Sequence, residues 1–158
     1  MKNKEYRIEV SNRENIFDPM GESARHDMVD LGIKGVKSVK VSQIYRIEAG
    51  SSPAEIDLLC GKLLADPVTQ RYLTAAAGKK TGPKSKYIVE VWLKPGVTDA
   101  VGESVMKAGK DMGISGLLNI NTGLKYYISG NTELTAEKIN TICSRLLANS
   151  VIQTYTIS

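Results

Sequence analysis

Apolar and charged residues alternate in short runs along the chain, and these runs are separated by segments whose apolar residues have helical spacing. The alternation at 6–12 and 87–93 is typical of half-buried β-strands. Asp18 and Asp99 each precede a helical pattern, which predicts an aspartate N-cap at both places. The apolar positions expected on these two helices are Met20, Ala24, Met28 and Leu31, and Val101, Val105, Gly109 and Met112.

Each of these helices is followed by a pair of short apolar runs. Gly32 and Gly113 fall where a left-handed C-cap would end the helix. We expect each pair of runs to form a β-hairpin, with Thr122-Gly123 as the turn of the second hairpin. The expected strands are 36–41, 44–48, 117–121 and 124–129.

A second helix and a last strand complete each pattern. Ser52 and Glu55 form a capping box around Pro53, and Thr135 caps the equivalent helix further along the chain. The expected buried faces are Ile56, Leu59, Cys60, Leu63 and Leu64, and Ile139, Ile142, Cys143, Leu146 and Leu147. The last strands are expected at 68–73 and 151–157.

The whole pattern occurs twice, which makes the chain a tandem duplication. Tyr6 aligns with Tyr87, and many identical residues follow at the same spacing. After a two-residue insertion, the stretch LLADPVTQRY at 63–72 aligns with LLANSVIQTY at 146–155. The predicted organisation is a first unit at 1–73, a basic linker rich in Gly, Ala and Lys at 74–86, and a second unit at 87–158.

The order of elements in each unit is βαββαβ, the α+β, ferredoxin-like pattern. Both helices of such a unit pack on one face of its sheet, so the other face would be left uncovered. A unit of this size also buries a small share of its surface. We therefore expect a covalent pseudo-dimer with approximate two-fold symmetry, in which the two sheets pack together.

The positive charge of the chain is concentrated in the linker. The 158 residues have a net charge of +4, and the segment 78–86 alone holds four lysines and no acid. The rest of the chain is therefore electrically balanced and has no basic stripe for nucleic acid. Aromatic residues make up only 6%, so stacking platforms for bases are not expected either.

No group of residues in the sequence has the spacing of a catalytic, cofactor or metal site. His26 lies off the apolar stripe of its helix and is expected on the surface. Cys60 and Cys143 occupy equivalent apolar positions and are expected to be buried and unreactive. The segment 78–85 resembles a phosphate-binding loop, but Pro83 replaces the second glycine and has no N–H to offer.

Repeated polar residues at the ends of helices and strands are candidates for structural or interface roles. An aspartate followed three positions later by glycine begins the first helix of both units. Glycine is unfavourable inside a helix, so its presence in both copies suggests close approach by another backbone. The candidates are Asp18, Gly21, Tyr72, Asp99, Gly102, Asn149 and Tyr155.

The start of the chain and its cysteines indicate a cytoplasmic protein. The first ten residues are charged and lack the apolar core of a secretory signal. No apolar run approaches the ~20 residues of a membrane span, and the two cysteines lack the spacing of a metal or redox site.

In the order and spacing of its motifs, each unit resembles PurS, the small subunit of bacterial and archaeal phosphoribosylformylglycinamidine synthase. The resemblance covers nearly the whole chain outside the linker. It departs from the family in fusing two copies, in Ala100 for a proline and in Gln153 for a glutamate. The motifs that carry it are Asp18-Pro19-Met20-Gly21, Leu31-Gly32, the segments 63–68 and 94–102, and the stretch 146–155, which looks like the family's LLANxVIExY ending.

The resemblance implies a part in de novo purine biosynthesis without catalytic residues or a cofactor of its own. In such systems a PurQ-type glutaminase releases ammonia and a PurL-type synthetase uses ATP to convert formylglycinamide ribonucleotide to the amidine. The PurS-like part docks these subunits to each other and helps to retain ammonia. The implied partners are therefore the synthetase and the glutaminase. The resemblance also allows a homodimer of this chain.

Two alternatives stay open at this level. Paired ferredoxin-like units also occur in regulatory modules that bind a small molecule, so this chain could be such a module. A fused pair of units is similar to the N-terminal domain of large single-chain synthases as well. The sequence therefore allows either a separate subunit or the first part of a longer polypeptide.

Overall fold

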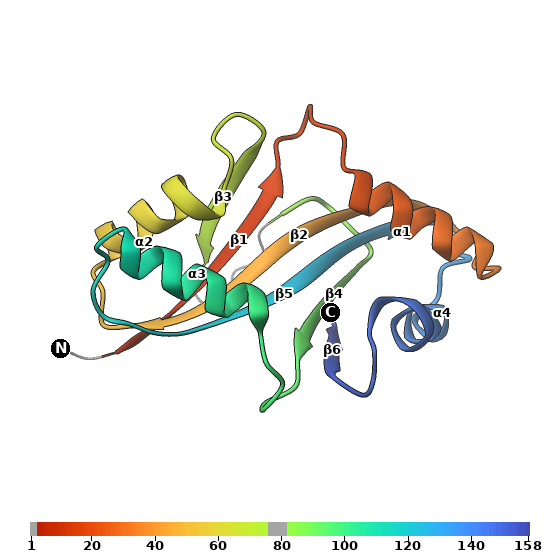
Figure 1. Ribbon diagram of the computed structural model, residues 1–158. Helices are drawn as coiled ribbons and strands as arrows, with labels where there is room; N and C mark the ends of the chain where they lie inside the picture. Colours follow the sequence, from red (N-terminus) through yellow and green to blue (C-terminus); the bar gives the residue numbers. More distant parts are fainter. Residues whose placement is uncertain (1–2, 76–81) are drawn as a thin grey trace. The chain divides into compact units, whose positions relative to one another are not determined.

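The protein is described by a computed structural model that covers residues 3–75 and 82–158 (Figure 1). The first repeat contains β1 (Lys4–Asn12), α1 (Pro19–Asp30), β2 (Val36–Ala49), α2 (Pro53–Leu59), the π-helical turn η1 (Cys60–Leu64) and β3 (Gln70–Ala75). The second contains β4 (Tyr87–Leu93), α3 (Ala100–Asp111), β5 (Leu117–Gly130), α4 (Ala136–Ile142), the π-helical turn η2 (Cys143–Leu147) and β6 (Gln153–Ile157). The α+β class and the tandem repeat are confirmed.

The six strands belong to one sheet, in the order β3-β1-β2-β5-β4-β6. β1 pairs antiparallel with β2 and with β3, and β4 pairs antiparallel with β6. The two sheets that were expected to pack together are therefore parts of a single sheet.

The expected hairpins are also wrong, because one long strand replaces each of them. β2 and β5 are continuous strands of 14 residues each. A two-residue hairpin at Thr122-Gly123 would require positive φ, and Gly123 does not adopt it. Positive φ occurs instead directly before each long strand, at Gly35 and Gly116, among other glycines outside the strands.

The compact parts of the molecule combine segments from both repeats. The first unit consists of 1–16, 43–81 and 98–123, and the second of 17–42, 82–97 and 124–158. Helix α1 thus belongs to the second unit, and α3 to the first. A strand of 14 residues is about 45 Å long, and β2 contributes residues 36–42 to the second unit and 43–49 to the first.

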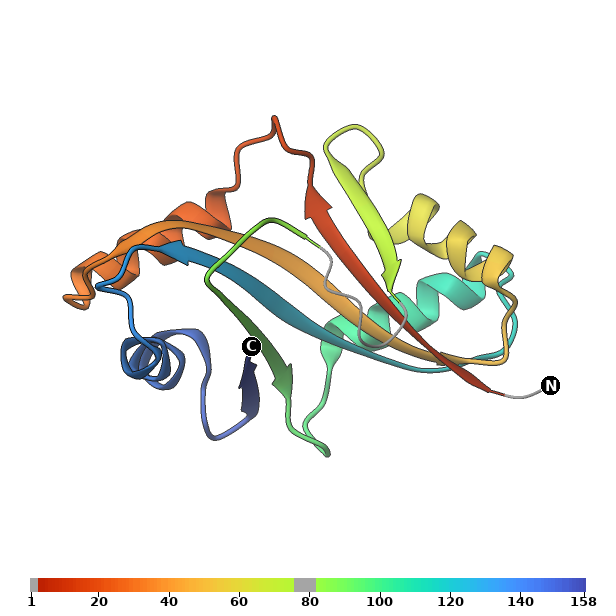
Figure 2. The same ribbon diagram turned by 180° about the vertical axis from the view of Figure 1, so that it is seen from behind.

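In the first unit, α2 and α3 cover the strand face that carries Ile8 and Val10 (Figures 1 and 2). The two helices approach closely, since a Cβ added at Gly109 of α3 would lie 3.3 Å from a methyl group of Leu59. The buried core of this unit is Ile8, Val10, Tyr45, Ile47, Ala49, Ile56, Leu59, Cys60, Leu64, Ala65, Ile114, Leu117 and Ile120.

In the second unit, α1 and α4 contribute to an equivalent core. Met28 of α1 and Ile142 of α4 are both fully buried there. The core is completed by strand residues from β2, β4 and β5 and by the loop residue Leu134. Its members are Ala24, Met28, Val39, Val89, Val91, Tyr126, Ile128, Leu134, Ile139, Ile142, Cys143 and Ala148.

The expected helix faces are correct except near the helix ends. Leu63 is 38% exposed, whereas the other predicted residues of its face in the first unit are buried. The π-helical turn explains this: the N–H of Ala65 donates to the carbonyl of Cys60, five residues back, which changes the direction of the intervening side chains. Exposed residues among those expected on the faces of α1 and α3 are Met20, Val101 and Met112.

The second face of the sheet in the first unit is charged, so it can remain in contact with water. Glu5 lies opposite Glu48, and Arg7 lies opposite Arg46, in the pairing of β1 with β2. Glu5 Oε1 lies 3.7 Å from Arg7 Nε and 3.5 Å from Arg46 Nε. The ion pair along β1 and the diagonal pair with Arg46 offset the like charges that face each other across the strands.

Two sequence expectations concern segments other than the core. The strand expected after the linker is confirmed as β4, while residues 78–81 of the segment that resembles a phosphate-binding loop lie outside the described residues. Across 3–75 and 82–158, none of the helices combines the length and the apolar character that crossing a membrane requires.

Candidate functional site

Asp18 and Asp99 connect the first helix of each repeat to its long strand. Asp18 Oδ1 accepts from the N–H of Gly21 at 2.9 Å, and Oδ2 accepts from the N–H of Val41 at 2.8 Å. Asp99 accepts from Gly102 N–H at 2.8 Å. Each aspartate therefore caps a helix and also ties it to the centre of β2 or β5.

Asp99 has more hydrogen bonds than Asp18, because Thr122 replaces Val41 in the second repeat. The N–H of Thr122 donates to Asp99 Oδ2 at 2.6 Å. The hydroxyl of Thr122 lies 2.9 Å from Oδ1 and 3.1 Å from Oδ2 of Asp99. Both oxygens of each carboxylate therefore accept hydrogen bonds inside the fold, which gives the two aspartates a structural role.

Gly21 and Gly102 allow the close approach that these hydrogen bonds need. A Cβ on Gly21 would lie 2.2 Å from the carbonyl oxygen of Val39, and one on Gly102 would lie 2.2 Å from that of Ile120. The approaching backbone is the strand of the same repeat. Glycine is therefore needed here for helix–strand packing within each unit.

Asn149 forms the turn that joins η2 to β6. Its Oδ1 accepts from the N–H of Val151 at 3.0 Å, and its own N–H donates to Gln153 Oε1 at 2.8 Å. In the first repeat, Asp66 and Gln70 make the same two contacts at 2.8 and 2.9 Å. The Gln153 side chain thus closes the second turn in the way that Gln70 closes the first.

Tyr72 and Tyr155 occupy equivalent strand positions but have different neighbours. The Tyr72 hydroxyl donates to Asp57 Oδ1 at 2.6 Å, and this hydrogen bond raises the pKa of Tyr72 to about 12. Asn140 replaces Asp57 in the second repeat, and its amide donates instead to Ala136 O at 3.2 Å. Tyr155 packs against the core of the second unit.

The two cysteines are buried and free, as expected. Burial raises the pKa of the Cys60 thiol to about 12 and that of Cys143 to about 11. Both groups are therefore protonated near neutral pH and are poor nucleophiles.

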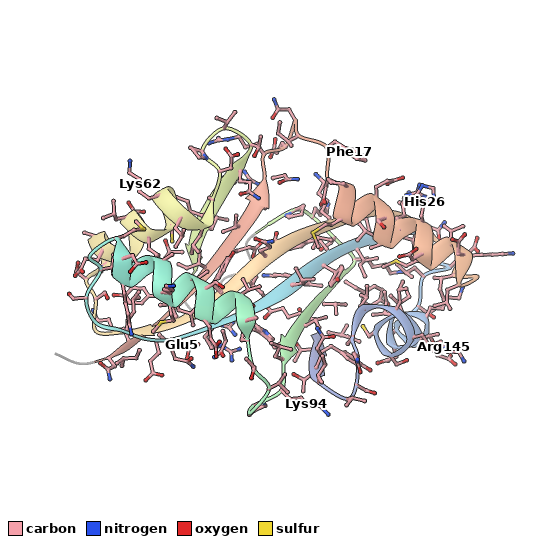
Figure 3. The ribbon with its side chains drawn as sticks, viewed as in Figure 1. Glu5, Phe17, His26, Lys62, Lys94 and Arg145 are labelled. Atoms are coloured by element: carbon pink, nitrogen blue, oxygen red, sulfur yellow. The ribbon has the colours of Figure 1, made fainter. Side chains whose placement is uncertain are left out.

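His26 lies on the surface, as expected, and points away from α1 (Figure 3). Its side chain is 68% exposed, and its Nε2 lies 3.5 Å from Glu22 Oε1. Arg25 makes the shorter contact with the same oxygen, at 2.6 Å. His26 is thus part of a surface ion-pair group on α1.

Among the described residues, an open hollow in each unit has room for a ligand or a partner side chain. The hollow in the second unit, about 360 Å³, lies between α1 and η2, and its lining is mostly apolar. The hollow in the first unit, about 590 Å³, includes Glu5, Arg7 and Asp57. Neither contains a nucleophile paired with a base, and the described residues include no group of three or more metal-binding side chains.

The seven candidate residues therefore form separate local groups and do not form a single site. Asp18, Gly21, Asn149 and Tyr155 lie in the second unit, and Tyr72, Asp99 and Gly102 lie in the first. Sequence reasoning missed their partners, which are Val41, Asp57, Thr122 and Gln153. The only available signal was that Gln recurs four residues after Asp66 and after Asn149.

The chain is similar to known PurS proteins in both halves. It is 39% identical over 70 residues to the phosphoribosylformylglycinamidine synthase subunit PurS of Archaeoglobus fulgidus, a match that covers 41% of this chain and 88% of the relative. It is 31% identical over 83 residues to the same subunit of a Synechocystis species, which covers 48% of this chain and 83% of the relative.

The family model of PurS, described as phosphoribosylformylglycinamidine (FGAM) synthase, matches the chain twice, at 5–77 and at 86–158. Together the two matches account for nearly all of its residues, and they coincide with the two βαβαβ successions of the structure. The chain therefore belongs to the PurS family, with two PurS repeats in tandem in one polypeptide.

Proposed function

We propose that this chain is a non-catalytic assembly subunit, or domain, of glutamine-dependent FGAM synthase. In this proposal it joins a PurL-type synthetase to a PurQ-type glutaminase and limits the escape of ammonia between them. The observation that carries the proposal is the double match to the PurS family, together with relatives that are named as subunits of this synthase.

The side chains of the described residues support a structural role. The aspartates, Asn149 and Tyr72 that sequence reasoning singled out are engaged in helix caps, a turn and a strand–helix contact. The cysteine thiols are buried and protonated near neutral pH. A scaffold needs such fixed surfaces more than reactive groups.

The proposal includes the cytoplasm as the location of the protein. Cys60 and Cys143 are both free thiols, and a reducing compartment keeps thiols in this state. The substrates of the proposed reaction, a nucleotide precursor and ATP, also belong to that compartment.

Reconstitution with the synthetase and the glutaminase of the organism that encodes the chain tests the proposal. We expect glutamine-dependent formation of FGAM to rise when the chain is added, while turnover with ammonium changes little. The three proteins should also co-elute in size-exclusion chromatography. Unchanged glutamine-dependent turnover together with no co-elution would contradict the proposal.

A second measurement addresses ammonia retention. An excess of an ammonia-consuming dehydrogenase is added to the glutamine-dependent reaction. We expect FGAM formation to persist in the complete assembly and to be suppressed when the chain is omitted. Equal suppression in both cases would remove ammonia retention from the proposed role and leave docking alone.

A further inference from the structure

A buried tyrosine in the second unit has a hydroxyl group without a partner in the protein. Tyr126 of β5 is only 8% exposed, and it belongs to the lining of the hollow between α1 and η2. Among the described residues, none forms a hydrogen bond with its hydroxyl. Nearly all buried polar groups have such a bond, so this exception calls for an explanation.

The equivalent tyrosine of the first repeat does have a partner. Tyr45 is 6% exposed, and its hydroxyl donates to Gln43 Oε1 at 3.2 Å. Leu124 stands in the place of Gln43 in the second repeat, and a leucine side chain offers no acceptor. The second copy therefore keeps the buried tyrosine but lacks the side chain that satisfies it.

The hydroxyl of Tyr126 can be reached from the hollow. Within 3–75 and 82–158, the one side-chain polar atom that is fully enclosed and lacks a hydrogen bond is Ser85 Oγ. The Tyr126 hydroxyl is therefore not sealed inside the core. Because the Tyr126 side chain lines the hollow, a molecule in the hollow can supply the missing partner.

Two further differences between the repeats shape the hollow. Ala24 stands where the first repeat has Val105, which packs against the core of the first unit, so the second repeat has a smaller side chain here. Asp27 stands where the first repeat has Ala108, so a carboxylate is added to the lining. The volume of about 360 Å³ is within the usual range of small-molecule sites, about 300–1,000 Å³.

The walls and the single carboxylate define which ligand fits. Asp27 is the charged residue in the lining. The other charges nearby on α1 offset each other, since Arg25 Nη2 lies 2.6 Å from Glu22 Oε1. A carboxylate only accepts hydrogen bonds, so the ligand must offer N–H donors, and a tyrosine hydroxyl can accept one as well. The apolar walls are Pro19, Met20, Ala24, Leu146 and Leu147.

We infer that this hollow binds a small molecule that carries a cationic amine or amidine on an apolar body. The cationic group pairs with Asp27, an N–H of the ligand donates to the Tyr126 hydroxyl, and the apolar body packs against Met20 and Leu147. The inference goes beyond the proposed function, because it gives the chain a ligand of its own. All of the lining residues belong to the second unit.

Benzamidine is a suitable probe, since it carries an amidinium group on an apolar ring. Benzoate has the same ring with the opposite charge and is the matched control ligand. The full chain labelled with ¹⁵N is titrated with each compound and followed by NMR. We expect benzamidine to shift the amide signals of Ala24, Tyr126 and Leu147 and to bind about fivefold or more tightly than benzoate. The inference is overturned if benzamidine leaves these signals unchanged, or if benzoate binds equally well.

Two variants test the polar groups without disturbing the core. Asp27→Asn, at an exposed position, should remove the preference for benzamidine over benzoate. Tyr126→Phe should weaken benzamidine binding about threefold or more and leave the melting temperature unchanged, because no hydrogen bond within the protein is lost. Unchanged benzamidine binding by both variants would show that the probe does not use this site.

Tyr45→Phe is the matched control, because it makes the same change at the equivalent position of the first unit. It should lower the melting temperature, since the bond to Gln43 is lost, and leave benzamidine binding as in the wild type. Ala24→Val introduces the side chain of the first repeat and should abolish binding by filling the hollow. Wild-type binding by Ala24→Val would place the ligand elsewhere.

An arginine or lysine side chain of a partner has the same chemistry as the probe. The titration is therefore repeated with the synthetase and with the glutaminase present, and we expect the affinity for benzamidine to stay the same. Displacement of benzamidine by either subunit would assign the hollow to a partner side chain and overturn the inference. Failure of both subunits to bind the chain would contradict the proposed function, whereas the titrations of the isolated chain would still decide the inference.

Discussion

The two compact units have the same backbone framework but differ in the side chains that stabilise it. In both, an aspartate caps the first helix and accepts from the long strand, and a glycine lets helix and strand approach. The first unit adds Thr122 to the hydrogen bonds of its cap, whereas the second unit has Val41 there. The first unit also pairs Tyr72 with Asp57, a contact that the second lacks.

Comparing the two units distinguishes the contacts that the fold requires from contacts that one of the units lacks. Contacts in which backbone meets backbone, at Gly21 and Gly102, are the same in both copies because any side chain would collide there. Contacts near the surface, such as the bond between Tyr72 and Asp57, have changed in the second copy. Divergence after duplication is therefore greatest where the structure can relax or water can substitute.

The largest loss of stability is expected from Gly21→Ala and Gly102→Ala, which disturb the helix–strand contact that both units share. Each new methyl group would lie 2.2 Å from a strand carbonyl, so helix and strand must separate. We expect each substitution to lower the free energy of unfolding by about 3 kcal/mol or more, measured by urea denaturation.

Gly50→Ala is the matched control for these glycines, because its Cβ would lie at an ordinary distance, 3.5 Å, from the nearest atom. It should change the free energy of unfolding by less than about 1 kcal/mol. A similarly small effect at Gly21 or Gly102 would show that the close approach is not needed for stability.

Removal of the two helix caps should have an intermediate effect on the free energy of unfolding. This effect should differ between the two units. Asp18→Ala removes two hydrogen bonds and should lower the free energy of unfolding by about 1–2 kcal/mol. Asp99→Ala removes the equivalent two bonds and also leaves the hydroxyl of Thr122 without its acceptor, so about 2–3 kcal/mol is expected.

A double-mutant cycle with Thr122→Val sharpens this comparison. If the threonine hydroxyl accounts for the difference, Asp99→Ala should lose less stability in the Thr122→Val background, close to the loss for Asp18→Ala. Equal losses for the two aspartates in the unmodified chain would contradict the role given to Thr122.

The smallest effect on stability is expected at Tyr72. Its dependence on pH is the most direct way to measure it. The hydrogen bond to Asp57 raises the pKa of Tyr72 from 10.0 to about 12. The folded state thus keeps a proton that the unfolded chain loses, so this contribution to stability is complete below pH 10 and is lost as pH rises toward 12. Ultraviolet titration should show that Asp57→Asn brings the pKa of Tyr72 back toward 10.

Tyr72→Phe should lower the free energy of unfolding at neutral pH by less than about 1 kcal/mol, because the bond is near the surface. Tyr155→Phe is the control, since the structure records no hydrogen bond for its hydroxyl within the described residues. A loss for Tyr155→Phe as large as that for Tyr72→Phe would show that the Asp57 contact contributes nothing.

Local signals in the sequence were sufficient for most of the secondary structure. Asp18, Asp99, Ser52 and Thr135 cap helices as predicted, and Gly32 ends α1 with φ of +88°. Capping and left-handed glycines depend on a few neighbouring residues, which explains why the sequence alone reveals them. The duplication was visible for the same reason, because repeated residues can be aligned without knowing their contacts.

The partners of the candidate residues could not be predicted in this way. Asp18 and Val41 are 23 residues apart, and Asp57 and Tyr72 are 15 apart. Nothing in the local pattern indicates which donor will reach a given carboxylate, since that depends on how the helix lies on the strand. The exposure of Val68 and Val151 could not be predicted either, because valine usually signals a buried strand position.

By itself, the sequence determined the α+β class, the two PurS repeats, and the ends of the helices. Only the tertiary structure decided that Val36–Ala49 and Leu117–Gly130 are continuous strands and that helices α1 and α3 are exchanged between the compact units. The physical reason is that a strand of 14 residues with no left-handed residue at its centre cannot fold back on itself. Each helix therefore packs where its end of the strand lies, and the two repeats complete each other's cores.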